Sequence, residues 1–492
     1  MYQSTRNKNI TASSSEAIVR GIAADGGLFM FSSESDIKID VLSLIGKTTF
    51  FMATEILSKL LPDFSKEEMA EIVRKAYSGK FETDELTPTV KIGNEYILEL
   101  FRGPTSAFKD VALSILPLLL TASAKKNGID DDIVILTATS GDTGKAALEG
   151  FQDVPGTKII VFYPEEGVSA VQKKQMITQK GNNTLVVAVK GNFDDAQTGV
   201  KNIFASFKGK EGVRLSSANS INIGRLAPQV VYYFKAYSDL IEMGDIKFGD
   251  KVNFCVPTGN FGDILAGYIA KLMGLPVGKL IVASNANNVL TDFFNTGIYD
   301  KRRAFLKTAS PSMDILISSN LERLLYLSSG CDNDKTAAYM ASLNEKGFYK
   351  IEAEQLARLQ SEFYAGCLSD EGTAGVIKNT YEKKGYLSDT HTAVGIGVYE
   401  EYKEKTGDKT PTVILSTASP YKFSGFVASA IGVEAGENEF ETMRRLEEKT
   451  GVPIPKNLKN LEELEVLHKT VISKEEMGDL VSAKASEKVW KR

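Results

Sequence analysis

Three short segments of the chain combine glycine with side chains that could bind an anion. They are GPTSAFKD (Gly103–Asp110), TSGDTGK (Thr139–Lys145) and PTGNFGD (Pro257–Asp263), and each stands where a β-rich run gives way to a helical stretch. Glycine lets the backbone approach a ligand closely, and the free N–H groups and dipole of a helix N-terminus favour a phosphate or a carboxylate. One such turn is weak evidence, because strand-to-helix turns are often glycine-rich for packing alone. Three of them together predict an anion-binding cleft.

Lys109 is the residue in these segments that is best suited to covalent chemistry. Ala107 and Phe108 precede it and an apolar stretch follows it, so its ammonium group is expected to be partly desolvated. Desolvation lowers the pKa of a lysine and makes it a nucleophile suited to Schiff-base formation. The alternative is a lysine that extends from the start of a helix to solvent. The residues alone leave both interpretations open.

A nucleotide-binding module is disfavoured by the same segments. The P-loop pattern requires glycine where Thr139 stands and serine or threonine where Ala146 stands, so TSGDTGKA does not fit it. The GNFGD segment lacks the third glycine of the dinucleotide-binding pattern, and no GxGxxG follows a strand.

The elements that must position these turns alternate between strand and helix from about residue 95, which predicts an α/β fold with parallel sheets covered by helices. In such sheets ligands bind where the strands end in loops. The strands are expected at Glu95–Phe101, Ile133–Ala138, Lys158–Tyr163, Thr184–Lys190, Val213–Ser216, Lys251–Val256, Leu280–Ala283 and Thr412–Ser416.

The length of 492 residues predicts more than one packed unit. We expect a mostly helical N-terminal unit over residues 1–92 and α/β lobes over 93–285 and 371–434, with the site in the cleft between them. A helical insertion is expected over 286–370, and a charged helical tail, covering the surface, over 435–492.

The composition is that of a soluble globular protein, with 43% hydrophobic residues, 25% charged residues and a net charge of −5. It gives no support for nucleic acid or an anionic membrane as a partner. The uncharged run Val111–Ala124 is too short to span a membrane and predicts a buried helix. Three dispersed cysteines and two histidines argue against a disulfide framework and a metal site. The N-terminus lacks the apolar core of a signal peptide, so a cytoplasmic protein is expected.

Over nearly its whole length the chain resembles the long form of threonine synthase, within the fold-type-II (tryptophan synthase β-like) pyridoxal-phosphate enzymes. The matching segments, in the family's order, are AIVRGIAADGGLFM, PTSAFKD, TSGDTG, SSANSINIGR, PTGNFGD, SPSMDI, SSNLERLL and THTAV. The resemblance implies parallel-sheet lobes with helices on both faces and pyridoxal 5'-phosphate as cofactor. We expect a monomer or a homodimer that acts on a small molecule. It also implies the last step of threonine biosynthesis, in which O-phospho-L-homoserine loses phosphate by β,γ-elimination and water adds at the β-carbon to give L-threonine.

The resemblance also implies a role for each matching residue. Lys109 matches the lysine that binds the cofactor covalently and then acts as a base, and Thr417 matches the hydroxyl that faces the pyridine nitrogen. The loop that cradles the cofactor phosphate is matched by Gly259, Asn260, Phe261, Gly262 and Asp263. Ser140, Asp142 and Thr143 match the loop that receives the substrate carboxylate, and Asn219, Ser220 and Arg225 match the residues that bind its phosphate. A guanidinium suits that last role, because it can bind two phosphate oxygens at once.

Some positions raise questions of their own. A carboxylate would repel the substrate carboxylate, so we expect Asp142 to face Lys145 or backbone N–H groups instead. Ser419 stands where several family members have histidine, so no role of that histidine is carried over. His391, in SDTHTAV where the family usually has DPHTAV, is either a site-lining residue or a structural one, and His468 is expected at the surface.

Two other functions stay open from the sequence. Another fold-type-II lyase, such as a threonine or serine dehydratase, has no need of Arg225 with Asn219 and Ser220. A threonine-synthase-like lyase or binding protein for a phosphorylated amino acid, without threonine production, would be indicated by loss of the lysine, which is present here.

Overall fold

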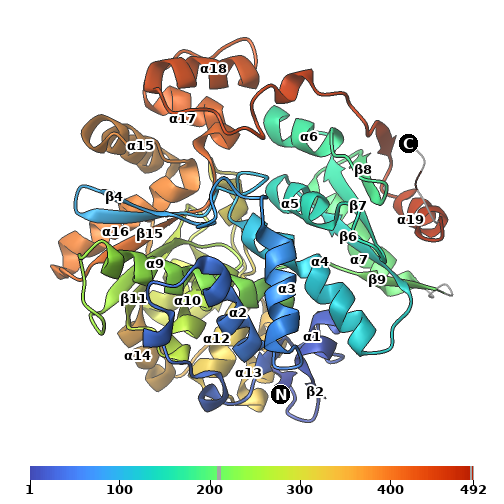
Figure 1. Ribbon diagram of the computed structural model, residues 1–492, viewed down its shortest axis with the longest axis horizontal. Helices are drawn as coiled ribbons and strands as arrows, with labels where there is room; N and C mark the ends of the chain where they lie inside the picture. The colour runs from blue at the N-terminus through green and yellow to red at the C-terminus, as the bar shows by residue number, and fades with distance from the viewer. Residues whose placement is uncertain (208–211, 488–489, 491–492) are drawn as a thin grey trace.

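Two sheets of mainly parallel strands form the centre of the molecule (Figure 1). The computed structural model describes residues 1–207, 212–487 and 490. The six-stranded sheet has the order β14 (Phe363–Cys367), β11 (Val277–Ser284), β10 (Val252–Pro257), β15 (Thr412–Ser416), β5 (Glu95–Glu99), β4 (Thr89–Ile92). Its neighbouring strands are parallel, except that β4 is antiparallel to β5. The five-stranded sheet is parallel, in the order β16 (Thr470–Ile472), β8 (Thr184–Val189), β7 (Thr157–Pro164), β6 (Asp132–Ala138), β9 (Val213–Ser216).

The helices cover both faces of these sheets. They are α1 (Ser14–Arg20), α2 (Thr49–Leu60), α3 (Lys66–Tyr77), α4 (Lys109–Lys126), α5 (Asp142–Phe151), α6 (Ala170–Ile177), α7 (Phe193–Ser206), α8 (Ile223–Leu226), α9 (Val231–Glu242), α10 (Gly262–Met273), α11 (Val289–Thr296), α12 (Leu321–Ser328), α13 (Asn333–Lys346), α14 (Ala353–Glu362), α15 (Asp370–Lys384), α16 (Thr390–Thr406), α17 (Ser424–Ala430), α18 (Glu439–Thr450) and α19 (Met477–Ala485). The expected α/β fold is confirmed.

The central strands of both sheets have apolar side chains on both faces, and helices cover each face. Successive side chains of a strand point to opposite faces, so a strand covered on both sides needs a continuous apolar run. Val413 and Leu415 of β15 pack in the core cluster that contains residues of α10, whereas Ile414 between them packs in the cluster that contains residues of α16. In β6 Ile135 faces the cluster with α5, and Val134 faces the cluster with α7 and α19. The TVILS and IVILTA runs therefore predict buried central strands.

The N-terminal region is less separate than its sequence suggests. It contains a small antiparallel sheet, β2 (Thr11–Ala12), β1 (Tyr2–Ser4) and β3 (Phe29–Phe31), which the sequence analysis missed. Its side chains share one apolar cluster with α4, α9 and α10. Strand β4 ends at residue 92 yet pairs with β5, so the boundary expected there runs through the six-stranded sheet.

The other two expected units also contribute strands. The region 286–370 is largely helical, with the paired strands β12 (Ile298–Asp300) and β13 (Phe348–Lys350), but it also supplies the edge strand β14. In the C-terminal region β16 extends the five-stranded sheet, and α19 packs on α7 through buried Met477, Val481 and Ala485. Because these three residues recur every four positions, they form one helical stripe, and this part of the tail belongs to a core.

Helix α4 is the buried helix expected around Pro117, and its start carries Lys109. It lies so close to α5 that a Cβ on Gly150 would stand 2.0 Å from the carbonyl oxygen of Leu113. This contact holds the beginning of α4 against the last turn of α5. Across the described ranges of the chain, no helix combines the length and the apolar character that a membrane crossing requires.

Candidate active site

The predicted turns lie at the carboxyl ends of strands from both sheets. The turn before α4 follows β5, the turn before α10 follows β10, and Thr417 follows β15, and these three strands belong to the six-stranded sheet. The turn before α5 follows β6 of the five-stranded sheet. The site is therefore assembled between the two sheets, as ligand sites of open parallel sheets are.

Lys109 is the first residue of α4. The backbone N–H of Phe108 donates to the carbonyl oxygen of Thr417 at 2.8 Å, which ties this turn to the end of β15. The Lys109 ammonium donates to the Ser312 hydroxyl at 3.5 Å. Burial lowers the pKa of Lys109 to about 8, although the charge of Asp142 opposes this. Lys109 is thus a desolvated amine suited to nucleophilic attack.

Asp142 has a different partner from the one we expected. Lys145 forms an ion pair with Glu149 at 2.8 Å, one turn along α5. The Asp142 carboxylate instead pairs with Lys422 at 2.6 Å and accepts a hydrogen bond from the Gln172 amide at 2.7 Å. Burial would raise the pKa of this carboxyl, but the nearby Lys422 ammonium holds it well below its usual range. Of the two partners expected for Asp142, Lys145 was wrong, because Glu149 takes up that ammonium and Lys422 reaches Asp142 from the turn after β15.

The loop before α10 has the geometry of an anion cradle. Phe261 has a φ of 64°, in the left-handed region, and it reverses the chain directly before the first helical residue, Gly262. The N–H groups of the first helical turn are free to bind a ligand. A Cβ on Gly259 would lie 2.8 Å from the carbonyl oxygen of Ser312, so this position has no room for a side chain. Asn260 is exposed.

The side chain of Asp263 anchors this loop from within the protein. Its Oδ1 accepts hydrogen bonds from the hydroxyls of Tyr232 at 2.5 Å and Tyr233 at 3.0 Å, both in α9. Burial raises the pKa of Asp263 to about 6, because the two tyrosine hydroxyls offset only part of the desolvation of its carboxylate. The backbone of Asp263 belongs to the cradle, whereas its carboxylate holds α10 against α9.

Arg225 is a buried arginine in α8. One nitrogen donates to the carbonyl oxygen of Ala218 at 2.6 Å, and Nε has no hydrogen-bond partner among the described residues. Burial lowers the pKa of Arg225 to about 10, and no carboxylate within the described parts of the chain pairs with it. Such a guanidinium retains donors for a bound anion. The neighbouring Asn219 is exposed and Ser220 is half-buried.

The remaining predicted residues differ in exposure. Thr417 is buried directly after β15. Ser140 is exposed and Thr143 is half-buried, so hydroxyl groups are present on the turn before α5. The charges of Asp142 and Arg225 both influence the pKa of Lys109, which indicates that the three predicted groups lie near one another.

Comparisons with known families cover almost the whole chain. Residues 1–77 match the family described as "Threonine synthase N terminus", and residues 392–477 match "Threonine synthase, C-terminal". Residues 83–418 match "Pyridoxal-phosphate dependent enzyme". A protein named "Threonine synthase" from Pseudomonas aeruginosa is 38% identical over 432 residues, covering 87% of this chain and 90% of that protein. The chain belongs to the threonine synthase family of pyridoxal-phosphate-dependent enzymes.

Solved structures agree with this assignment to the threonine synthase family. The crystal structure of pyridoxal-phosphate-bound threonine synthase from Brucella melitensis has a TM-score of 0.88 and 36% identity, covering 99% of both chains. The yeast threonine synthase structure has a TM-score of 0.87 and 33% identity, covering 98% of both. "Threonine synthase-like 1" from Homo sapiens is 41% identical over 438 residues, which cover 85% of this chain, and the chain spans only 58% of that relative's length.

The residues present fit pyridoxal phosphate, the cofactor of this family. The free N–H groups at the start of α10 and the desolvated Lys109 amine provide the phosphate cradle and the nucleophile that it requires. Lys109 would hold the aldehyde carbon, the loop from Gly259 to Asp263 the phosphate, and Thr417 the ring nitrogen.

Asn320, directly before α12, and Arg323, in α12, connect the two loops that are proposed to bind anions. Neither residue was assigned a role from the sequence. The Asn320 amide donates to the carbonyl oxygens of Asn260 at 3.1 Å and Ser220 at 3.3 Å. The fully buried Arg323 donates to the Asn320 side chain at 2.5 Å and to the carbonyl oxygen of Ile221 at 2.6 Å. The segment SSNLERLL, which contains both residues, was among the segments that match the family. Their role could not be predicted from it, because their partners lie in loops that are distant in the sequence.

The two histidines are both buried. His391 accepts a hydrogen bond from the backbone N–H of Ser312 at 3.2 Å, and its Nδ1 lies 2.9 Å from Asp389. Of the two interpretations of His391, the structural one describes these contacts, and the histidine holds the Ser312 turn beside Lys109. His468, expected at the surface, is buried with its Nε2 2.9 Å from the carbonyl oxygen of Gln179. That expectation was wrong because the tail docks on the five-stranded sheet.

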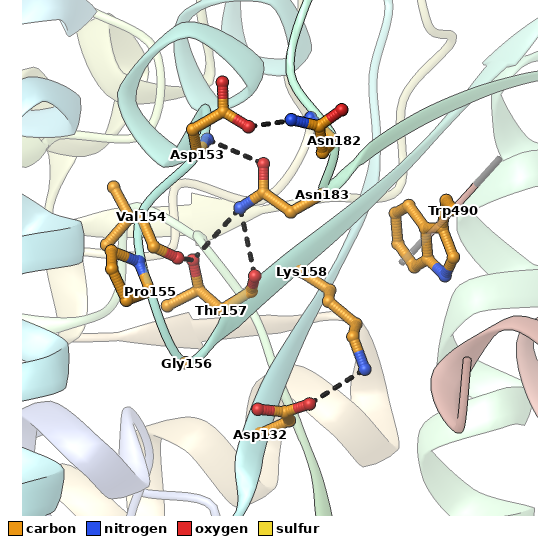
Figure 2. Close-up of a pocket in the computed structure, with 10 residues that line it drawn as sticks. All are labelled: Asp132, Asp153, Val154, Pro155, Gly156, Thr157, Lys158, Asn182, Asn183 and Trp490. Carbon is orange, nitrogen blue, oxygen red and sulfur yellow. Dashed lines mark hydrogen bonds and ion pairs between the residues drawn. The ribbon is translucent and has the colours of Figure 1, made fainter. Parts of the chain in front are cut away.

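A separate hollow lies at the amino ends of β6 and β7 (Figure 2). Its wall includes the ion pair of Lys158 with Asp132, 2.9 Å apart, and the ring of Trp490. None of the predicted site residues lines it. In a parallel sheet the amino ends face away from the ligand site, so this hollow is not part of the candidate active site.

Proposed function

We propose that this protein is a threonine synthase, which converts O-phospho-L-homoserine and water into L-threonine and phosphate. The observation that carries the proposal is Arg225, a buried guanidinium without a carboxylate partner in the described parts of the chain. Burying an unpaired cation costs free energy unless a ligand compensates the charge. The dianionic phosphate of this substrate provides that compensation, and Asn219 and Ser220 lie on the loop directly before α8.

The other proposed contacts follow from the geometry of the site. Pyridoxal phosphate, when bound, supplies an electron sink for the charge left when a proton leaves the substrate's α-carbon. Lys109 Nζ takes that proton, because its lowered pKa leaves much of the amine neutral near pH 8. The turn that carries Ser140, Asp142 and Thr143 binds the substrate carboxylate at the N-terminus of α5. Arg225 holds the phosphate while its leaving oxygen gains charge.

The proposal extends to the setting of the enzyme. A cytoplasmic location is supported by three cysteines that are all free. We propose a monomer or a homodimer that acts on a small molecule, and the net charge of −5 supports the view that nucleic acid is not its partner.

The test of this function is the variant Arg225→Leu. Loss of one buried charge partner costs about 2–5 kcal/mol, so kcat/KM for O-phosphohomoserine should fall between about 30-fold and about 5,000-fold. Arg225→Lys should recover only part of the loss, because an ammonium lacks the two-pronged geometry of a guanidinium. Both threonine and phosphate are assayed. Arg214→Leu, which removes an exposed arginine, is the matched control and should keep parental rates.

Binding of an unphosphorylated amino acid, followed by the cofactor's absorbance, should persist in Arg225→Leu, since this arginine is assigned only to the phosphate. Near-parental kcat/KM in Arg225→Leu would place the substrate phosphate elsewhere. A parent enzyme that deaminates threonine or serine but does not use O-phosphohomoserine would favour the dehydratase alternative.

A second candidate is a lyase or binding protein for a phosphorylated amino acid that makes no threonine. It is favoured by the 41% identity to "Threonine synthase-like 1", whose name states only a likeness to threonine synthase. The same assay separates the two candidates, since phosphate release without an equal amount of threonine would support the second.

A further inference from the structure

Lys422 is a buried lysine at the centre of the candidate site to which neither the motifs nor the proposed reaction assigns a role. It lies in the short turn Pro420–Phe423 after β15 and is 1% exposed. Its ammonium pairs with Asp142 at 2.6 Å and donates to the carbonyl oxygen of Thr105 at 3.0 Å. Thr105 belongs to the turn that carries Lys109. The Lys422 ammonium therefore links the turn after β15, the turn before α4 and the turn before α5. The first two turns follow strands of the six-stranded sheet, and the third follows a strand of the five-stranded sheet.

Asp142 needs such a partner because of its position. It begins α5, on the turn proposed to receive the substrate carboxylate, and it is itself buried. Two carboxylates close together in a poorly solvated site repel each other strongly. Gln172 also donates to Asp142, and it packs so tightly on Gly141 that a Cβ there would lie 2.5 Å from the Gln172 side chain. The Asp142 carboxylate is thus held between the Lys422 ammonium and the Gln172 amide.

The resulting pair is electrically neutral. With the charge of Asp142 balanced by Lys422, the field at the start of α5 is set by the helix dipole and its free N–H groups, which favour an anion. The hydroxyls of the exposed Ser140 and the half-buried Thr143 add donors. Without Lys422, an uncompensated buried carboxylate would cancel this field.

We propose that Lys422 is a positioning residue for the substrate carboxylate, because it neutralises Asp142 and holds it within the turn. This inference rests on the proposed function for the role of that turn. It deepens that function by naming the group that lets a turn with an aspartate accept an α-amino acid.

The test compares ligands with and without a carboxylate. L-norvaline and its carboxamide, L-norvalinamide, are titrated into the cofactor-loaded protein, and binding is followed by the cofactor's absorbance. Lys422→Met should weaken norvaline binding at least about 100-fold, because the Asp142 charge is left unpaired. Norvalinamide, which carries no carboxylate, should weaken less than about fivefold. Lys158→Met is the matched control, since that buried lysine also pairs with an aspartate but lies at the amino ends of the strands, away from the candidate site, and it should bind both ligands as the parent does.

The double variant Lys422→Met/Asp142→Asn gives the sharpest result. It removes both charges together, so norvaline binding should return to within about tenfold of the parent, with norvaline again preferred over norvalinamide. This variant decides the question even where Lys422→Met alone does not fold. Loss of the preference in a folded double variant would overturn the proposal, and so would parental norvaline binding in Lys422→Met or an equal loss for both ligands.

The proposed function and the role of Lys422 can be contradicted independently of each other. A parent enzyme that fails to make threonine from O-phosphohomoserine contradicts the proposed function, while the norvaline titrations still decide the role of Lys422. Conversely, a parent that makes threonine together with an unaffected Lys422→Met variant contradicts only the inference about Lys422.

Discussion

Single residues in this site obtain their chemistry from the balance between burial and nearby charge. Burial lowers the pKa of a lysine and raises that of an aspartate. Lys109 follows this rule, with its pKa lowered to about 8, and so does Asp263, with its pKa raised to about 6. Asp142 departs from it, because the neighbouring Lys422 ammonium outweighs burial and keeps the carboxylate charged. Two aspartates at helix starts thus have opposite electrostatic environments.

The lowered pKa of Lys109 predicts how the cofactor-free protein reacts with pyridoxal phosphate. Only the neutral amine attacks an aldehyde, so the association rate should rise with pH, be half-maximal near pH 8 and level off above it. Stopped-flow absorbance between pH 6 and pH 10 measures this profile. Borohydride reduction and mass spectrometry should place the trapped cofactor on Lys109, and Lys109→Ala should trap none. A rate that still rises steeply at pH 10 would indicate an ordinary exposed lysine.

At the scale of elements, the site depends on close contacts between turns from different parts of the chain. The loop before α10 packs against the 3-10 turn Pro311–Met313 at Gly259. That turn is held by His391 and offers the Ser312 hydroxyl to Lys109. The turn Pro311–Met313 therefore sets the position of the loop before α10 relative to Lys109.

Gly259→Ala should weaken pyridoxal phosphate binding about tenfold. Its Cβ would meet a backbone carbonyl oxygen at 2.8 Å, and because backbone cannot rotate away as a side chain can, the cradle must shift. The dissociation constant is measured by fluorescence titration of the cofactor-free protein. Gly375→Ala, in α15 with no atom within 4 Å of the added Cβ, is the control and should bind the cofactor as the parent does. Equal affinity in both variants would remove this loop from the cofactor site.

At the scale of the whole molecule, the C-terminal region completes the five-stranded sheet and its core. Figure 1 shows α19 beside α7, on the far side of this sheet from α5. Met477 fills the space above Gly199, where a Cβ would lie 2.3 Å from its sulfur atom. The lobe that carries Asp142 is thus supported by residues more than 300 positions later in the sequence.

Met477→Ala should destabilise this lobe by about 2–5 kcal/mol, because it leaves a cavity between α19 and α7. Urea unfolding followed by circular dichroism should show an earlier transition than in the parent. Met243→Ala, at a methionine that is 42% exposed, is the control and should change the midpoint little. An unchanged midpoint in Met477→Ala would mean that the tail docks without contributing to the stability of the lobe.

Much of the fold and part of the site could be predicted from the sequence. The strand over Thr412–Ser416 was predicted with the bounds that the structure shows, and β6 to within one residue, because continuous apolar runs bounded by turns are local patterns. Strands such as β4 and β16 were missed. They are short, and β16 has exposed positions, so only pairing with a neighbour makes them strands.

The sequence by itself determined the α/β fold and the three glycine-containing turns, because each depends on residues close together in the chain. The structure decided between the two interpretations of Lys109, whose ammonium is desolvated by burial. Only the tertiary structure decided which charges meet. Asp142 was expected to face Lys145, three positions away, or backbone N–H groups, yet its ion-pair partner is Lys422, 280 positions away. The contacts of Arg323 with the loop at Ile221 are of the same kind. Electrostatic pairing depends on distance in space, and the distance between two side chains on different sheets is set only when the sheets pack together.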